Sequence, residues 1–535
     1  MEPLRTTTVG GEKPERRNRK LQLRISIFVL ILVVLTALAV GIYERWPREY
    51  FPPTTPGLAA RVDTYMGQVM ASRAAPGIAV GVVRGDAFVF AKGYGVQHSK
   101  EGGSVRPETV FHTASVSKTF VALAVMQLVE RGQLDLDAPV TRFLPYFRLA
   151  DLRSAELITV RQLLSHTSGL PTDVEGGNWW ESPEQDPGAL ERYIRSLDNR
   201  FPVAGPGDKW HYSNIGYEVL GDVIAKVSGM TFEDYMDVNV FRPLGMRSST
   251  FLPYQGPLED LAWPHRGNLM PTVSAVYPYH RAHAPSSTLK SNLPDLGRWL
   301  AVHFNRGLVN GNRILSSSLM ESMWESQAEV DDSGLKMALG WFLRRHRGNR
   351  MILHAGRDPG FNTCIALLPD HGVGVILLSN YDGQSAFEMV EIADGLLDIG
   401  QGRPPSMPRA SILIPLAKTL ARDGVPAVIE EYRRLRKDDR YSYTNSDLST
   451  LGHELRRGNR LEEAIQLYSL NAAEHPEYFA PYLFLAETYL KIGDETRALD
   501  YYRKGLACDP EGRWGFPLSE YRIDRLEELM RKADR

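Results

Sequence analysis

The sequence predicts an α/β domain between an N-terminal membrane-spanning helix and a C-terminal all-helical domain. Three observations support this prediction. Extended apolar segments occur within residues 76–95 and 350–379, on both sides of a long and mainly helical stretch. A segment without any charge lies at 25–42. After a proline-rich linker at 401–410, helical patterns continue to the end of the chain.

Length and composition indicate a globular protein of several domains. The chain has 535 residues, an apolar fraction of 43% and a formal net charge of −2. This length predicts two or three domains, and a charge so close to zero gives no reason to expect nucleic acid as a partner. The only two cysteines, Cys364 and Cys508, exclude a disulfide framework, and no Cys/His cluster has metal-ligand spacing. We therefore expect no metal and no cofactor.

The N-terminal residues predict a signal-anchor. Residues 1–24 form a polar, basic tail, and the segment 25–42 would span about 27 Å as a helix, close to the hydrocarbon thickness of a membrane. The basic flank predicts a cytoplasmic N-terminus, so the rest of the chain would lie in the periplasm or outside the cell. Residues 37–39 (Ala-Leu-Ala) resemble a cleavage site, so a cleaved signal peptide is the alternative. A linker follows at 43–57.

The α/β domain is expected at residues 58–400. Apolar periodicity and turn residues predict elements mainly near its two ends. These are a helix at 59–72, strands at 76–83, 87–95, 350–355, 360–368 and 373–379, and a closing helix at 386–397.

The segment 111–130 contains the strongest candidates for chemistry. It predicts an apolar helix with Thr113 as its N-cap. Ser115 and Lys118 stand at its start, three positions apart, and share a helix face. A lysine partly removed from water favours its neutral form, and a neutral amine beside a hydroxyl can take its proton. The structural alternative is a capping serine and a lysine that reaches solvent, and the same spacing recurs at 287–290.

Two later segments supply further polar candidates. Tyr212 precedes an apolar helix predicted at 215–228 and is a candidate acid or base. Asn214, at the helix start, is either a capping residue or an amide that orients a substrate carbonyl or the lysine. His354 begins a His-Ala-Gly tripeptide at the end of a predicted strand.

These candidates occur in the order and spacing of a known superfamily. The motifs at 115–118 (Ser-Val-Ser-Lys), 212–214 (Tyr-Ser-Asn) and 354–356 (His-Ala-Gly), with the flanking segment 164–170, resemble those of serine β-lactamase-like hydrolases. That superfamily includes class C β-lactamases, penicillin-binding D,D-peptidases and β-lactamase-like carboxylesterases. The resemblance covers residues 58–400. It implies a β-lactamase/transpeptidase-like antiparallel sheet, flanked by helices and carrying an all-α insert.

The resemblance also implies a role for each candidate. Ser115 would be the acylated nucleophile, Lys118 the base that activates it, and Tyr212 the residue that protonates the leaving group and later helps water attack. The oxyanion hole would consist of the backbone N–H groups of residues 115 and 357. The residues implied to bind substrate are Asn214, His354, Gly356 and Arg357.

The third motif departs from that of class C β-lactamases, which resembles Lys-Thr-Gly. A histidine is only partly charged near neutral pH, so His354 is expected to hold a β-lactam carboxylate less well than lysine would. An ester, amide or peptide bond is therefore the expected target, with efficient β-lactam hydrolysis less favoured. Arg357 is bulky at a position that is often small, and it either binds a carboxylate or points to solvent.

Residues 411–535 are predicted to be helical. Positions 34 residues apart match in type, among them Leu451 with Leu485 and Ala464 with Ala498. This period resembles that of tetratricopeptide repeats, which usually present a groove to a peptide or protein partner. An appendage that braces the hydrolase is the alternative.

Two functions of different classes follow. The first is a membrane-anchored serine hydrolase, which cleaves a small-molecule ester, an amide or a peptide through an acyl-Ser115 intermediate. The second is a catalytically weak or inactive β-lactamase-like scaffold, which binds a peptide or protein through its helical repeats. The complete set of catalytic residues favours the hydrolase.

Overall fold

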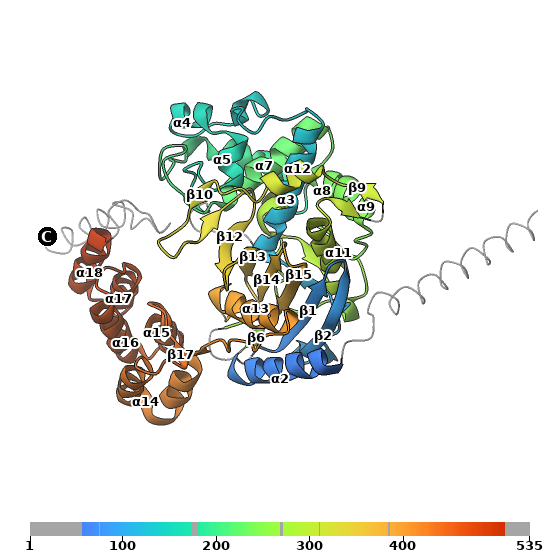
Figure 1. Ribbon diagram of the computed structural model, residues 1–535. Helices are drawn as coiled ribbons and strands as arrows, with labels where there is room; N and C mark the ends of the chain where they lie inside the picture. Colours follow the sequence, from blue (N-terminus) through green and yellow to red (C-terminus); the bar gives the residue numbers. More distant parts are fainter. Residues whose placement is uncertain are drawn as a thin grey trace, which may run out of the picture. The chain divides into compact units, whose positions relative to one another are not determined.

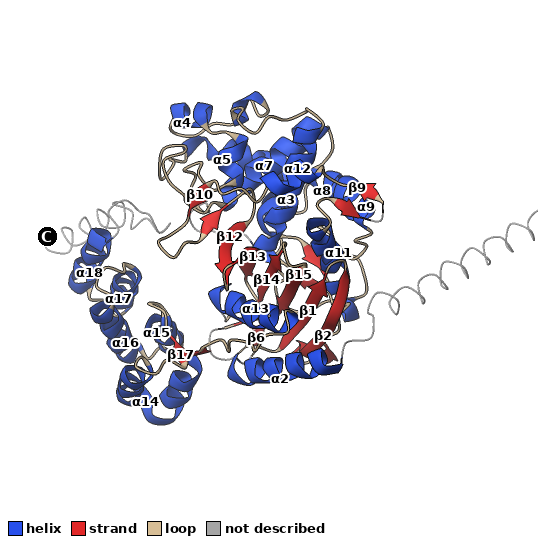
Figure 2. Ribbon diagram, in the orientation of Figure 1, coloured by secondary structure: helices blue, strands red, loops and turns tan. Residues whose placement is uncertain are grey.

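The structure is a computed structural model that describes residues 56–508, except 74, 174–179, 181, 268–270, 310 and 384–385. Figures 1 and 2 show an α/β domain followed in sequence by a run of helices. The predicted membrane anchor lies outside the described residues. Within them, no helix combines the length and the apolar character that a membrane span requires.

The α/β domain is built on a nine-stranded antiparallel sheet with the order β10-β11-β12-β13-β14-β15-β1-β2-β3. Its strands are β1 (Gly77–Arg84), β2 (Ala87–His98), β3 (Gly102–Ser104), β10 (Ala328–Glu329), β11 (Lys336–Met337), β12 (Phe342–His346), β13 (Asn349–Asp358), β14 (Phe361–Leu368) and β15 (Val373–Ser379). Strands from the two ends of the domain meet in the middle, where β1 pairs with β15 and Ile78 lies opposite Ser379. The predicted strands at 76–83 and 87–95, which pair as a hairpin, and the three predicted closing strands are therefore confirmed.

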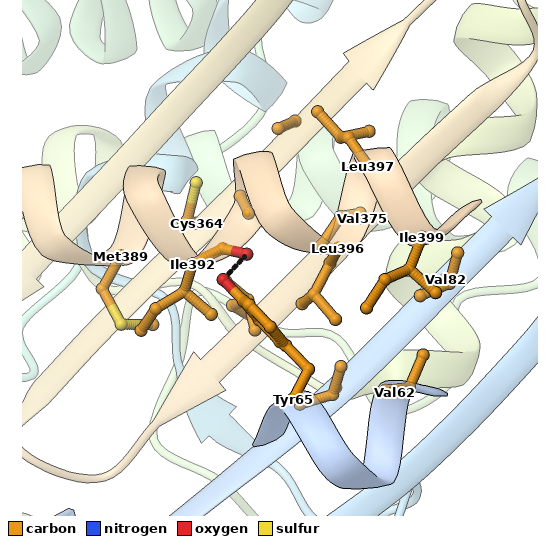
Figure 3. Close-up of a cluster of buried hydrophobic side chains, with 14 of the residues drawn as sticks. Val62, Tyr65, Val82, Cys364, Val375, Met389, Ile392, Leu396, Leu397 and Ile399 are labelled. Carbon is orange, nitrogen blue, oxygen red and sulfur yellow. Dashed lines mark hydrogen bonds between the residues drawn. The ribbon is translucent and has the colours of Figure 1, made fainter. Parts of the chain in front are cut away.

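One face of the sheet is covered by α2 (Pro56–Arg73) and α13 (Ala386–Gly400) (Figure 1). Their apolar side chains pack with strand residues such as Val375 in one buried core (Figure 3). The Tyr65 hydroxyl donates to the backbone carbonyl of Ile392 and so links the two helices. This packing makes the sheet a firm support for the groups on its other face.

The opposite face carries the helical insert. Its helices are α3 (Ser117–Glu130), α4 (Leu152–Leu157), α5 (Val160–Leu164), α6 (Ala189–Arg195), α7 (Asn214–Ser228), α8 (Phe232–Met236), α9 (Arg242–Leu244), α10 (Ala284–Ser287), α11 (Leu293–Phe304) and α12 (Ser317–Ser322). Helix α3 is central, since residues 117–128 are all buried. Phe120 on α3 stacks on Trp299 of α11, with ring centroids 3.8 Å apart. The insert therefore holds the start of α3 against the sheet.

The C-terminal region is helical, as predicted. Its helices are α14 (Leu413–Leu435), α15 (Asp447–Arg457), α16 (Leu461–Glu474), α17 (Ala480–Lys491) and α18 (Glu495–Cys508). Leu451 in α15 and Leu485 in α17 are both fully buried, as are Ala464 in α16 and Ala498 in α18. The residues that match at the 34-residue period thus occupy core positions of successive helix pairs. Their assignment to tetratricopeptide repeats stays a prediction, and residues 509–535 lie outside the described part of the chain.

Candidate active site

Ser115 lies on a tight turn that leads into helix α3. It is the middle residue of a short 3-10 helix, Ala114–Val116. Ala114 has a φ of +49°, in the left-handed region that residues with side chains seldom adopt. The prediction that Thr113 caps the helix is wrong, because its hydroxyl donates to the carbonyl of Leu289 instead. A strained turn, rather than a capped helix start, therefore presents the serine.

Lys118 is fully buried, which rules out a side chain that reaches solvent. Its Nζ atom lies 3.1 Å from the Oγ of Ser115, and it donates to the carbonyl of Ser286 over 2.8 Å. The amine also lies over the rings of Tyr212 and Tyr217, 5.0 and 5.6 Å from their centroids. All of these contacts are to uncharged groups. The serine and the lysine are close enough for a proton to pass between them.

Strand β13 passes so close to the serine turn that position 356 requires glycine. A Cβ atom on Gly356 would lie 2.5 Å from the carbonyl oxygen of Thr113 and 2.8 Å from the backbone nitrogen of Ser115. The hydroxyl of Thr363, on β14, donates to the same Thr113 carbonyl. The N–H of Ser115 is thereby set beside the strand that continues into Arg357, the arrangement that an oxyanion hole of these two N–H groups needs.

A cavity of about 970 Å³ opens beside the serine. Ser115, Tyr212, His354 and Arg357 line it together, although they come from distant parts of the sequence. The helical insert supplies the first two residues and strand β13 supplies the others. The structure therefore gathers these four predicted residues around one space large enough for a small molecule, whereas Lys118, Asn214 and Gly356 are not among its described lining residues.

Tyr212 packs against His166, a residue to which the sequence analysis assigned no role. The ring centroids are 4.3 Å apart. His166 is fully buried, and its Nδ1 accepts a hydrogen bond from the backbone N–H of Ser213, so its Nε2 carries the ring proton. Burial and the nearby charge of Lys118 lower the pKa of His166 well below its usual value. The only sequence signal for this residue was its place in the flanking segment 164–170.

His354 is an uncharged hydrogen-bonding residue in this site. It is fully buried on β13, and its Nδ1 donates to the carbonyl of Ala355 over 2.8 Å. Burial, and then the charge of Lys118, lower the pKa of His354 to about 3. The partly charged histidine expected from the sequence is thus corrected to a neutral one. The strand also continues to Asp358, beyond its predicted end at the alanine.

Asn214 does not cap helix α7, because Ser213 does so by accepting the N–H of Gly216. The Asn214 side-chain nitrogen donates to Asp173 over 2.9 Å. Its side-chain oxygen is buried and has no hydrogen-bond partner among the described residues. The contact to Lys118 considered from the sequence is therefore not formed, and Asn214 is not among the described residues that line the cavity.

Arg357 lines the cavity, but its side chain is held by the loop after β15. Its Nε donates to the backbone carbonyl of Asp382 over 2.9 Å. Side chains alternate along a strand, so Arg357 and Gly356 face opposite sides of the sheet. The guanidinium is exposed, and it keeps donors free for a ligand.

The second Ser-x-x-Lys pair does not form a nucleophile site. The Ser287 hydroxyl donates to Asp358. Lys290 lies in β7 (Lys290–Ser291), where its amine donates to the carbonyls of Leu252 and Thr288. Burial lowers the pKa of Lys290 to about 7. The two side chains therefore have separate partners.

Comparison with known proteins agrees with this geometry. The family described as Beta-lactamase matches residues 62–396. The chain belongs to the beta-lactamase family. Members of this family are serine acyltransferases and hydrolases that act on amide, ester and peptidoglycan-like substrates. Penicillin-binding protein 4 of Amycolatopsis lactamdurans is 30% identical over 364 residues, which is 65% of this chain and 94% of that protein.

Other relatives and solved structures resemble the same part of the chain. Protein flp of Staphylococcus aureus (strain MW2) is 25% identical over 339 residues, 62% of this chain and 65% of its own length. An octameric penicillin-binding protein homologue from Pyrococcus abyssi is 26% identical, with a TM-score of 0.56 over 68% of this chain and 81% of its own. The structure of a class C beta-lactamase mutant is 21% identical, with a TM-score of 0.56. The match covers 64% of this chain and 97% of that chain, and it shows that the two share a fold. The superfamily inferred from the motifs is confirmed.

Proposed function

We propose that this member of the beta-lactamase family is a membrane-anchored serine hydrolase. It cleaves an ester, amide or peptide bond outside the cytoplasm, through an acyl-serine intermediate. The observation that supports this most is the 3.1 Å contact between the Ser115 hydroxyl and the buried Lys118 amine, at the edge of a cavity. The hydroxyl and the amine are already in contact, so no other part of the chain has to move to bring them together.

In the acylation step, the Ser115 oxygen attacks the carbonyl carbon of the substrate, and its proton passes to the amine of Lys118. The backbone N–H groups of Ser115 and Arg357 stabilise the negative charge that develops on the carbonyl oxygen. Tyr212 then protonates the departing oxygen or nitrogen while its bond to the carbonyl carbon breaks. The products are the free leaving group and an ester between the acyl group and Ser115.

In the deacylation step, water attacks the carbonyl carbon of this ester. Tyr212, which gave its proton to the leaving group during acylation, removes a proton from the water in the reverse of its first role. The same two N–H groups stabilise the oxyanion, and the bond to the Ser115 oxygen breaks. Lys118 returns the proton to the Ser115 oxygen, and the acid leaves.

The neutral His354 favours substrates other than β-lactams. At neutral pH it offers no positive charge at the first position of the third motif, where class C enzymes have the lysine of Lys-Thr-Gly. Ala355 also has no hydroxyl to bind a carboxylate next to the cleaved bond. Esters and peptides that need no such carboxylate contact are therefore the preferred substrates of this proposal.

Two further parts of the proposal concern regions outside the α/β domain. The uncharged segment 25–42 and its basic flank support an N-terminal anchor, with the catalytic domain in the periplasm or outside the cell. The buried, repeating positions in α15–α18 support tetratricopeptide-like repeats that bind a peptide or protein.

Covalent labelling tests the hydrolase. A fluorophosphonate probe is expected to label the wild type and Ser287→Ala, which changes the second Ser-x-x-Lys pair, but not Ser115→Ala or Lys118→Ala. Hydrolysis of short-chain esters should follow the same pattern. A folded wild type that neither takes the label nor hydrolyses any ester would favour the scaffold alternative.

A further inference from the structure

We propose that the active-site cavity contains a second subsite, which binds an anionic group on the leaving-group part of the substrate, far from the bond that is cleaved. This inference rests on the proposed hydrolase function and names its substrate class. The substrate would carry a carboxylate or a phosphate at the end of an elongated alcohol or amine. The main residue of the subsite is Arg345.

The charged residues that line the cavity are all basic. No aspartate or glutamate is found among its described lining residues, while the basic ones are Lys336, Arg344, Arg345, Arg350 and Arg357. Three of these side chains have carboxylate partners outside the lining: Glu329 for Lys336, Asp394 for Arg344 and Asp370 for Arg350. Arg345 and Arg357 instead donate to backbone carbonyls.

Arg345 has no carboxylate partner among the described residues. On the antiparallel pair β12–β13 it lies directly opposite Arg350, which is already paired with Glu321 and Asp370. Its side chain is exposed, and its Nη1 donates to the carbonyl of Gly348 over 2.7 Å. A bound anion would give Arg345 the charged partner that it lacks and would use the remaining guanidinium donors.

The distance from the catalytic groups defines the length of the ligand. Arg350 precedes His354 by four residues on β13, which corresponds to about 13 Å along the strand. Leu335, Leu343 and Leu353 line the same cavity with apolar surface. A matching leaving group therefore has an apolar middle part about as long as four extended peptide residues.

The position of Tyr212 shows which part of the substrate enters this cavity. A proton donor to the leaving group must be within hydrogen-bond reach of its reacting atom. Tyr212 and His354 line the cavity, so the leaving group rather than the acyl group lies along it. The anion thus belongs to the alcohol or amine that is released.

Acetate esters of matched alcohols test the subsite. The wild type should hydrolyse the acetate of ω-hydroxydecanoic acid with a kcat/KM about two- to fivefold higher than the acetate of the corresponding amide, as expected for a single exposed ion pair. The short ω-hydroxypropionic acid should show no such preference over its amide. The acetate of decanediol monophosphate determines whether phosphate or carboxylate is the better group.

Substitutions then locate the effect. Arg345→Gln should abolish the preference for the acid, Arg345→Glu should reverse it, and Arg345→Lys should retain most of it. Arg153→Gln changes an exposed arginine outside the cavity and should keep the full preference. Equal rates for acid and amide in an active wild type, or a preference that persists in Arg345→Gln, would overturn the subsite alone. Loss of all acetate hydrolysis together with loss of Ser115 labelling would overturn the hydrolase as well.

Discussion

The imidazole of His166 lies against the phenol of Tyr212, with ring centroids 4.3 Å apart and ring planes inclined by 34°. The backbone N–H of Ser213 fixes the imidazole from behind by donating to its Nδ1 over 3.1 Å. The amine of Lys118 also lies 5.0 Å from the centroid of the phenol ring. His166 thus acts as a positioning residue that keeps Tyr212 over the lysine.

Substitution of His166 should therefore act through Tyr212. Asparagine tolerates the φ of +56° at this position, so His166→Asn should fold and lower kcat by about tenfold, with a smaller effect on KM. Tyr212→Phe should lower kcat by about a hundredfold or more. In the double variant, the histidine substitution should add no further loss. Steady-state kinetics measure this, and independent, additive losses would contradict the positioning role.

Gly356→Ala should slow acylation strongly. The new Cβ would meet the Ser115 nitrogen and the Thr113 carbonyl at distances below 3.0 Å, so strand and serine turn must move apart. Because an oxyanion donor is displaced, we expect the rate of fluorophosphonate labelling to fall about a hundredfold or more. Gly67→Ala, on α2 with open space around it, is the matched control and should label at the wild-type rate. Unchanged labelling of Gly356→Ala would disprove the close approach.

The pH dependence of kcat/KM should show no ionisation of His354 between about pH 5 and 8. Burial and Lys118 lower its pKa to about 3, so the imidazole is neutral across this whole range. The profile of His354→Gln should therefore have the wild-type shape, at a lower rate. An acidic limb near pH 6.5 that is present in the wild type and absent from the variant would show a charged histidine.

His354→Lys should increase the rate of acylation by carboxylate-bearing β-lactams.

His346 should make stability depend on pH in the neutral and basic range. It lies between two carboxylates of α13, 3.2 Å from Asp394 and 3.0 Å from Asp398, which also pair with Arg344 and Arg347. The hydrogen bond to Asp394 is the largest effect, and it raises the pKa of His346 above 6.5. The folded state therefore gains stability from the protonated ring below pH 6.5, and loses it as pH rises through the raised pKa.

Urea unfolding of the wild type and His346→Gln at a series of pH values measures this contribution. The difference in unfolding free energy between the two proteins should be largest on the acidic side of the transition and should decline at higher pH. A difference that stays constant with pH would mean that the ring is not protonated in the folded protein.

The sequence predicted those features that depend on residues close together in the chain. The strands around Gly85, the helix at 386–397 and the i, i+3 relation of Ser115 and Lys118 are local patterns, and the structure contains all of them. The family motifs added Tyr212 and His354, which composition and spacing could not have brought to the same cavity.

The predictions that failed depend on contacts between distant segments. Thr113 is a good N-cap by type, but the carbonyl of Leu289 competes for its hydroxyl. His354 was expected to be partly charged, because the sequence does not show how completely the sheet and Lys118 enclose it. His166 was overlooked for the same reason, since its contact with Tyr212 spans an intervening loop.

The pairing of β1 with β15 has a consequence for how the protein folds. The hairpin β1–β2 lies near the start of the domain in sequence, but one edge of β1 stays unpaired until Val373–Ser379 become available. A contact between the two ends of a domain is slow to form, because the entropy of closing such a long loop must first be overcome. Until then the open edge of β1 can pair with strands of other chains, so a chain truncated before Val373 is expected to aggregate.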